Sequence, residues 1–275
     1  MENGQNFAMD YFSGIGYRST GLHRHPFHEL IYVKEGNLNF LVDDKLYKAS
    51  GNCVILFKEK RLHTSEVDRN SVYTRYNLNF RQKYVSELID YELLCDCFSA
   101  DCTVLPVASE ERETFGMLFE ALYRSYEDGG ERSVYDEAVC RHLFAAILAS
   151  VSRMARENPS AAGIYIDRSY IADVVRYIGE RLDKKLLIGD IAGEFFVSRA
   201  KLVNDFKAAC GITIGEYITA QRMKLAKKLL AEGFDVGSCA TRSGFANTCH
   251  FIRTFKAHTG VTPLKYAHSV RSLRG

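Results

Sequence analysis

Two hydrophobic patterns divide the chain. Between residues 30 and 57, four short apolar runs are separated by turn dipeptides of the Gly-Asn and Asp-Asp type: LIYV, LNFLV, LYKA and CVILF. Short strands between turn residues are typical of an antiparallel sandwich or barrel. From about residue 109 onward, apolar residues instead recur every three or four positions, which is the spacing of amphipathic helices. The pattern therefore predicts an α+β protein with a β-rich N-terminal part and a helical C-terminal part.

The first helical stretch has the pattern of a hairpin. One helix begins near Ser109, and a second runs over residues 134–156, with Gly129-Gly130 as the break between them. The apolar stripe on these helices could cover the β-sheet. The sequence that follows, Asn-Pro-Ser-Ala-Ala-Gly, has the composition of an interdomain linker.

The C-terminal third contains a repeat. The segment FKAACGITIGEY at residues 206–217 returns as FKAHTGVTPLKY at residues 255–266, with Phe, Lys, Ala, Gly, Thr and Tyr in register. Each copy predicts a short helix, a turn, and a second helix that starts at a capping Ser or Asn and stops at a Gly. The helices span residues 188–195 with 198–211, and residues 236–243 with 247–260. Each copy thus predicts a helix-turn-helix unit, whose second helix can enter the DNA major groove.

The segment between the copies predicts a connecting helix. Residues 214–231 carry apolar side chains at helical spacing, and a helix of that length is about 27 Å long. Such a helix could hold two recognition helices about one DNA turn, roughly 34 Å, apart. A further helix over residues 170–182 would buttress the first unit.

Charge is distributed unevenly along the 275 residues. From residue 161 onward there are 18 Lys+Arg and 10 Asp+Glu, a balance of +8, whereas the first 160 residues hold 18 and 24, a balance of −6. A basic C-terminal part joined to an acidic N-terminal part indicates a polyanionic partner for the former. The longest apolar run, residues 143–149, is far below the roughly 20 residues of a membrane span, and the N-terminus has no pattern of a secretory signal. We therefore expect a cytoplasmic protein without a membrane partner.

Residues 161–267 resemble the DNA-binding domain of the AraC/XylS family of transcription regulators. The strings that carry the resemblance are IGDIAGEFFVSRAKLVNDFKAACGITIGEYITAQRMKLAKKLL and SGFANTCHFIRTFKAHTGVTPLKY. Arg222 and Ala226 match the family's connecting helix, Gly244-Phe245 its second turn, and GVTP its closing segment. The chain departs from the family pattern at Asp205, Gly193 and Cys239.

The resemblance implies a transcription regulator, not an enzyme, that binds a double-stranded DNA operator, forms a homodimer and can contact RNA polymerase. It also implies a small-molecule effector held by the N-terminal part. The predicted organisation is a cupin-like sensing β-barrel, a helical hairpin as candidate dimerisation element, a linker, and an all-α domain of two helix-turn-helix units. Their predicted bounds are residues 1–105, 106–157, 158–165 and 166–275.

The predicted DNA-reading face lies opposite the stripe of Leu202 and Phe206 on the second helix of the first unit, and on the matching face of the second unit. Its residues are Arg199, Ala200, Lys201, Val203, Asn204 and Lys207, with Asn247, Thr248, His250, Arg253 and Lys256. Arg suits guanine, Asn suits adenine, and Ala or Val can meet a thymine methyl group, whereas the two later lysines suit phosphates. For each single residue the alternative is a solvated side chain or a phosphate contact.

In the N-terminal part, His23-x-His25-x3-Glu29 followed by Gly36 resembles the first motif of the cupin superfamily. The three residues share parity, so on one strand their side chains would point to one side, although Pro26 hints at an edge or bulge. The second cupin motif is poor, because its histidine, His63, arrives one residue late.

Two interpretations of this motif stay open. In the one we favour, the His and Glu side chains hydrogen-bond at a barrel mouth or line an organic-ligand pocket, with no metal and no cofactor; the residues are His23, His25, Glu29 and His63. In the other, the same residues bind a divalent metal ion. The rival function is then a metal-dependent cupin enzyme that uses its helices for docking.

The eight cysteines do not form a recognisable metal or redox motif. The series Cys95-x-Cys97-x4-Cys102 is not a CxxC pair, and we expect buried reduced thiols there. The other five are scattered singly and are predicted to be small core residues: Cys53, Cys140, Cys210, Cys239 and Cys249.

Overall fold

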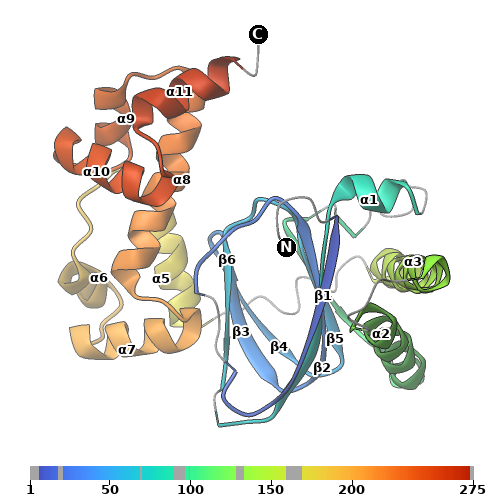
Figure 1. The fold of residues 1–275 in the computed structure, drawn as a ribbon. Helices are drawn as coiled ribbons and strands as arrows, with labels where there is room; N and C mark the ends of the chain where they lie inside the picture. Colours follow the sequence, from blue (N-terminus) through green and yellow to red (C-terminus); the bar gives the residue numbers. More distant parts are fainter. Residues whose placement is uncertain are drawn as a thin grey trace. The chain divides into compact units, whose positions relative to one another are not determined.

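The computed structural model describes residues 6–17, 21–68, 70–88, 97–98, 100–127, 133–158 and 169–272 (Figure 1). The chain packs as two compact units, residues 1–167 and 168–275. The first contains all the strands and a helical hairpin, and the second is entirely helical in its described part, so the predicted α+β multidomain class is confirmed. The Gly129-Gly130 break, Cys95 and all of the predicted linker but Asn158 lie outside the described residues.

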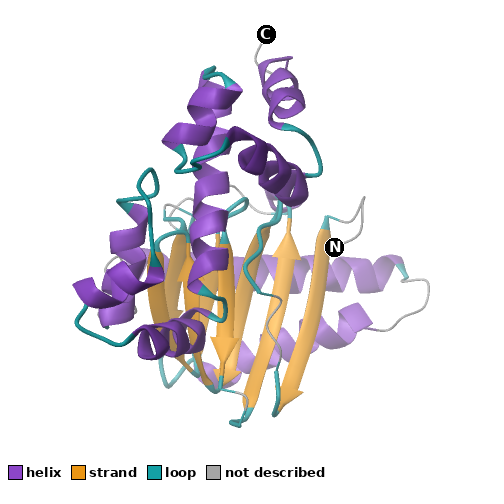
Figure 2. Ribbon diagram, turned by 90° about the vertical axis from the view of Figure 1, so that its left-hand side faces the viewer, coloured by secondary structure: helices purple, strands orange, loops and turns teal. Residues whose placement is uncertain are grey.

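The first unit contains two antiparallel sheets. The five-stranded sheet has the order β1-β7-β2-β5-β8 and the three-stranded sheet the order β4-β3-β6 (Figure 2). Their bounds are β1 Phe7–Gly14, β2 His28–Glu35, β3 Asn37–Val42, β4 Lys45–Ser50, β5 Cys53–Phe57, β6 His63–Val67, β7 Tyr73–Phe80 and β8 Cys102–Pro106. The four predicted runs form β2 to β5. In the described residues the two sheets form a cupin-like sandwich, one of the two arrangements that the sequence pattern predicted, and they do not close into a barrel.

The strands β2, β5 and β7 of the five-stranded sheet are buried on both faces. In β2, Ile31 and Val33 point to the interior of the sandwich, where they pack with Phe40 of the opposite sheet. Leu30 and Tyr32 point the other way, into a second apolar core. This explains why β2 lacks a polar-apolar alternation, since a strand covered on both sides is apolar throughout.

Two helices cover the outer face of the five-stranded sheet. Helices α2 (Arg112–Glu127) and α3 (Val134–Glu157) lie beside this sheet in Figure 1, and a short helix, α1 (Gln82–Ser86), follows β7. Phe119 and Phe144 are fully buried in the core that these helices share with the sheet. The apolar stripe of the hairpin therefore covers the sheet of its own chain, which was one of the two expected uses of that stripe.

Helix α3 is long and apolar enough to cross a membrane by length and composition, with a mean hydropathy of 1.3 over an 18-residue window. However, 44% of that window is buried inside the first unit, as in the core helix of many globular domains. The apolar character of α3 is thus accounted for by the sheet on which it packs.

The second unit contains the predicted repeat. Its helices are α5 Tyr170–Gly179, α6 Ile188–Glu194, α7 Arg199–Cys210, α8 Ile214–Glu232, α9 Val236–Arg242, α10 Thr248–Thr259 and α11 Pro263–Ser272. The side chains of Ser198 and Asn247 cap α7 and α10, and Gly211 and Gly260 end them with φ angles of 71° and 78°. Helix α8 connects the two copies and begins with a Thr213–Glu216 capping box.

One arginine ties together the parts of the second unit. Arg222, on α8, donates from Nε to the carbonyl of Leu182 (3.0 Å) and from Nη2 to the carbonyl of Lys184 (2.7 Å). Its guanidinium also lies 5.8 Å from the ring centroid of Phe245, in the turn between α9 and α10. The family-matching arginine therefore joins the loop after α5, the connecting helix and the second helix-turn-helix unit.

The seven cysteines in the described part of the chain form no disulfide, and all but Cys249 are buried. Cys97 and Cys102 are buried, as expected, and the Cys97 thiol donates to the Ser152 hydroxyl (3.3 Å). The prediction of a core position is wrong for Cys249, which is exposed at the start of α10. The reason is that its neighbour Phe251, rather than Cys249, faces the core of this unit.

Among the described glycines of the second unit, Gly244 leaves the least space for an added Cβ. Its φ is +79°, and a Cβ built there would lie 2.0 Å from the Leu182 carbonyl oxygen and 2.7 Å from the Arg222 guanidinium. We expect Gly244→Ala to lower the free energy of unfolding of this unit by about 3 kcal/mol or more. Gly260→Ala is the matched control, since φ is similar (+78°) and no atom lies within 4 Å of its added Cβ. It should cost about 1 to 2 kcal/mol, measured by chemical denaturation, and equal losses would contradict the contact argument.

Candidate functional site

The predicted DNA-reading residues lie on the accessible face of α7 and α10. Ten of the eleven are exposed, and Val203 is half-buried. The opposite faces carry Leu202 and Phe206 on α7, and Phe251 and Phe255 on α10, all fully buried. Each recognition helix therefore presents a polar face while its apolar face fixes its orientation within the second unit.

Two of these residues also serve the fold. The Lys201 ammonium pairs with Asp205 at 2.7 Å, and the Tyr170 hydroxyl donates to the same carboxylate. The Asn247 side chain accepts a hydrogen bond from the backbone of His250 as the cap of α10. Asp205, where the family usually has an apolar residue, thus joins α7 to α5, and the Lys201 ammonium is held at the side of α7.

The first unit contains a partly open cavity between its two sheets, where many polar side chains meet. The cavity has a volume of about 300 Å³. It is lined by Asp10, Tyr17, His23, His25, Phe27, Glu29, Ile31, Phe57, His63, Ser65, Arg75, Asn77 and Asn79. All four residues predicted from the cupin-like motif therefore face one space.

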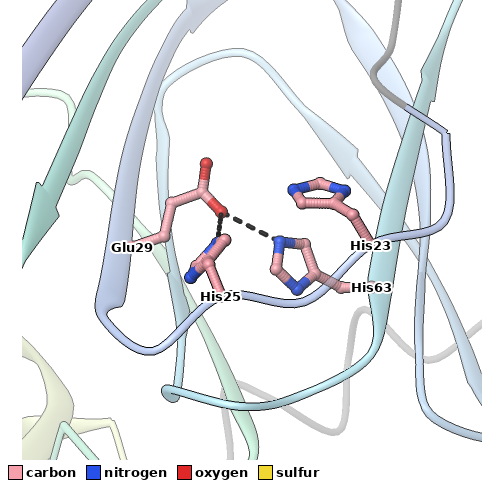
Figure 3. Close-up of side chains that lie close together, drawn as sticks. All are labelled: His23, His25, Glu29 and His63. Carbon is pink, nitrogen blue, oxygen red and sulfur yellow. Dashed lines mark hydrogen bonds and ion pairs between the residues drawn. The ribbon is translucent and has the colours of Figure 1, made fainter. Parts of the chain in front are cut away.

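The four residues converge from separate segments (Figure 3). The expectation that His23, His25 and Glu29 share one strand is wrong, because β2 begins only at His28 and a bend at Pro26 and Phe27 precedes it. His23 instead forms a backbone bridge with His63, the first residue of β6. His23 and His25 come near Glu29 because the loop before β2 folds back toward β6. Alternation of the three residues along one strand is not the cause.

Each histidine of this cluster is held by a backbone carbonyl. The Nδ1 atoms of His23, His25 and His63 donate to the carbonyl oxygens of Gly21 (2.9 Å), Phe27 (2.8 Å) and Arg61 (2.9 Å). The rings of His25 and His63 also stack on Phe27 and Phe57, with centroid distances of 3.9 and 4.6 Å. Hydrogen bonds and stacking together fix the orientation of these two imidazoles.

The Nε2 atoms of two of these histidines meet a single carboxylate oxygen. Glu29 Oε2 lies 3.2 Å from His25 Nε2 and 3.0 Å from His63 Nε2. Burial raises the pKa of Glu29, but the contacts with the two histidines outweigh burial and hold this pKa well below its usual range. Burial also lowers the pKa of His23. Glu29 is therefore a buried carboxylate at neutral pH.

A second polar group, not predicted from the sequence, lies on the wall formed by β1 and β7. Arg75 Nη1 pairs with Asp10 at 2.7 Å, its Nη2 donates to the Tyr17 hydroxyl (3.2 Å), and Asn77 Nδ2 donates to Asp10 (3.3 Å). Among the described residues, Arg75 Nε and Asn77 Oδ1 are buried without a hydrogen-bond partner. The cavity wall therefore offers one donor and one acceptor to a bound molecule.

The sequence did carry a signal for this wall. In β7, Arg75, Asn77 and Asn79 alternate with apolar residues, which normally indicates a strand with a solvated face. The structure turns that polar face into the sandwich, so these side chains line the cavity instead. Only the presence of a covering sheet on that side distinguishes the two cases.

The first unit, with a cavity lined by polar side chains, and the second unit, with two capped helix-turn-helix pairs, together define a DNA-binding regulator with a ligand-binding domain. The family model of the AraC-like ligand binding domain matches residues 11–150, and that of a helix-turn-helix domain matches residues 191–269. The chain belongs to the AraC family of transcriptional regulators, as the sequence analysis predicted.

Two curated relatives and one solved structure align with most of this chain. The HTH-type transcriptional regulator YfiF of Bacillus subtilis is 23% identical over 94% of this chain and 82% of its own. The HTH-type regulator YdiP of Escherichia coli is 24% identical over 89% of this chain and 79% of its own. Among solved structures, apo ToxT K231A of Vibrio cholerae aligns over 98% of this chain and 99% of its own, with 17% identity and a TM-score of 0.41.

Asn204 and Arg253 offer the sharpest test of base reading, one in each unit. Both are exposed on the recognition face, and the second unit gives neither a side-chain hydrogen bond among its described residues. We expect Asn204→Ala and Arg253→Ala each to weaken operator binding by roughly 1–3 kcal/mol and to relax preference at one base pair. Titration of wild-type and singly altered duplexes measures both effects. Arg124→Ala, an exposed arginine of the other unit, should change neither. An equal loss on every sequence would reassign the residue to a phosphate contact.

Proposed function

We propose that this regulator reads a bipartite DNA operator with α7 and α10, and that a small polar effector in the cavity of the first unit controls this binding. The observation that supports the operator most directly is the pair of recognition helices joined by α8. Its 19 residues correspond to about 28 Å of helix, near the length of one DNA turn. Because α8 is capped at both ends and Arg222 holds it, the two helices would bind as one rigid reader.

Base contacts are assigned on this proposal to the polar faces of α7 and α10. Asn204, His250 and Arg253 would read base edges, with Arg199, Ala200, Val203 and Thr248 beside them. Lys207 and Lys256 would neutralise phosphates. Lys201 already pairs with Asp205, and Asn247 already caps α10. These two residues would therefore contribute mainly by holding the two helices in position.

The cavity supports the proposal of an effector. Its volume of about 300 Å³ suits a small molecule, and its wall combines a buried arginine with a histidine cluster. We propose that His23, His25, Glu29 and His63 bind this effector together with Arg75 and Asn77. A ligand that places a hydrogen-bond acceptor against Arg75 Nε would give this buried N–H the partner that it lacks among the described residues. By favouring one arrangement of the DNA-binding units, the ligand would change DNA affinity.

Assembly and location belong to the same proposal. We propose a homodimer that meets DNA in the cytoplasm and contacts RNA polymerase. Since the hairpin stripe covers its own sheet, a dimer contact would use the opposite faces of α2 and α3. Those faces expose Met117, Val134, Tyr135 and Val139.

The rival function, a metal-dependent enzyme, rests on the histidine cluster alone. The relatives named above are transcriptional regulators. We propose that the chain is not an enzyme and that its cavity serves recognition.

The bipartite operator is testable by selection. Duplexes enriched from a random pool by the full-length protein at moderate salt should contain two half-sites about one helical turn apart. Inserting about 5 base pairs between them should abolish tight binding, because the insertion turns one half-site to the far side of the duplex. Inserting a full turn of DNA keeps both half-sites on one side, and so tests how rigidly α8 sets the distance between the two helices. Enrichment of a single half-site, insensitive to such insertions, would contradict a two-helix reader.

The effector site is testable through Arg75. Small polar metabolites are first screened for compounds that raise the melting temperature of the wild-type protein. The Arg75→Gln variant should bind these compounds at least about tenfold more weakly, because a charge-assisted hydrogen bond is lost. Affinity for the selected operator without added compound should stay unchanged. Arg124→Gln, an exposed arginine on α2, is the control. Full retention of compound binding in Arg75→Gln would remove Arg75 from the site.

A further inference from the structure

The turn between α6 and α7 holds a phenylalanine in a backbone conformation that favours glycine. Phe196 has a φ of +53°, in the left-handed region. Its backbone N–H donates to the carbonyl of Gly193 (3.1 Å), and the N–H of Val197 donates to the carbonyl of Ala192 (3.0 Å). These two bonds form a Schellman motif at the end of α6. The left-handed position of this motif is usually glycine, because a Cβ there crowds the backbone.

The second copy of the repeat has glycine at the matching position. Gly244 ends α9 with the same two backbone bonds and a φ of +79°. Glycine is required there because Leu182 and Arg222 lie against it. In the first copy the side chain of Phe196 is instead 96% exposed. The α6–α7 turn therefore has room for a side chain, but the fold of the unit gives the ring almost no contact.

Stability of the fold does not account for this ring. Of the four described non-glycine residues with positive φ, the other three are polar: Asp43, Asn52 and Lys60. Phe196 is also the most exposed of the large hydrophobic residues in the described part of the chain. Strained backbone positions concentrate at functional sites, where binding rather than folding uses the residue. The ring is therefore a candidate for contact with a partner molecule.

The position of Phe196 indicates which partner this is. It lies two residues before Ser198, the cap of α7, and the next residues, Arg199 and Ala200, are exposed as well. In a helix-turn-helix unit the first residues of the recognition helix contact base edges in the major groove. Thymine presents its methyl group in that groove, and apolar side chains recognise it. The positive charge of Arg199 beside the ring favours a polyanion over an apolar protein surface.

We propose that the ring of Phe196 packs against a thymine methyl group at the edge of the half-site that α7 reads. Phe196 is then a further specificity-determining residue, outside the recognition helices themselves. The inference rests on the proposed reading of an operator by α7. Because the ring is uncharged, it adds preference for one base without neutralising a phosphate.

The first test separates binding from folding with two variants of the full-length protein. Phe196→Ala and Phe196→Gly both remove the ring, and each should bind the selected operator about tenfold more weakly. Phe196→Gly should melt no lower than the wild type and higher than Phe196→Ala, because glycine adopts a positive φ without strain. A residue that served only the fold would instead lower the melting temperature and the affinity together.

The second test identifies the contact on the DNA. Each thymine of the α7 half-site is replaced singly by deoxyuridine, which lacks the methyl group. At one position the wild-type protein should lose about fourfold in affinity, whereas Phe196→Ala should lose nothing there. The salt dependence of binding should be unchanged in Phe196→Ala. In Lys207→Ala, the proposed phosphate contact, its logarithmic slope should fall by about 1.

Ile15→Ala is the control, because it removes an exposed apolar side chain (64%) of the first unit. It should leave operator affinity unchanged. Wild-type affinity in Phe196→Ala would overturn the proposal, and the ring would then be left for a protein partner. Equal deoxyuridine effects in the wild type and Phe196→Ala would overturn it too. Either result, with a wild-type protein that still selects an operator, leaves the proposed function standing. A wild-type protein that selects no operator removes both.

Discussion

The first unit depends on the burial of both faces of its five-stranded sheet. Helices α2 and α3 cover one face with an aromatic and aliphatic core, and the three-stranded sheet covers the other. This double cover determines what the alternating side chains of β2 and β7 do. Residues on the helix side build one core, and apolar residues on the inner side build another. Polar residues on the inner side, such as Arg75 and Asn77, line the cavity beside that second core.

The second unit achieves rigidity in a different way. Its helices are short, so most of their stability must come from packing and caps rather than from helix propensity. Ser198, Asn247 and the two terminal glycines delimit the recognition helices, while Arg222 and the close approach at Gly244 fix the turn between α9 and α10. The polar faces of α7 and α10 are left free because these internal contacts already set the helix orientation.

Local sequence patterns were sufficient for much of this architecture. The repeat, the capping residues and the glycines specified the helix-turn-helix units closely, since helix ends depend on interactions within a few residues. The apolar runs located β2 to β5. The fold of the loop before β2 back onto β6 and the exposure of Cys249 escaped prediction, because each depends on which distant segment packs against the residue in question.

The sequence by itself determined that the chain has a β-rich unit, a helical hairpin and a basic double helix-turn-helix unit, and it identified His23, His25, Glu29 and His63 as candidates for one site. Only the tertiary structure decided that the loop before β2 folds back onto β6 and brings one nitrogen or oxygen atom from each of these four side chains within 4.8 Å of the others. Only the tertiary structure likewise turned the polar side of β7 inward. The physical reason is the same in both cases: periodicity tells which side chains share a face, whereas packing between remote segments decides what that face meets.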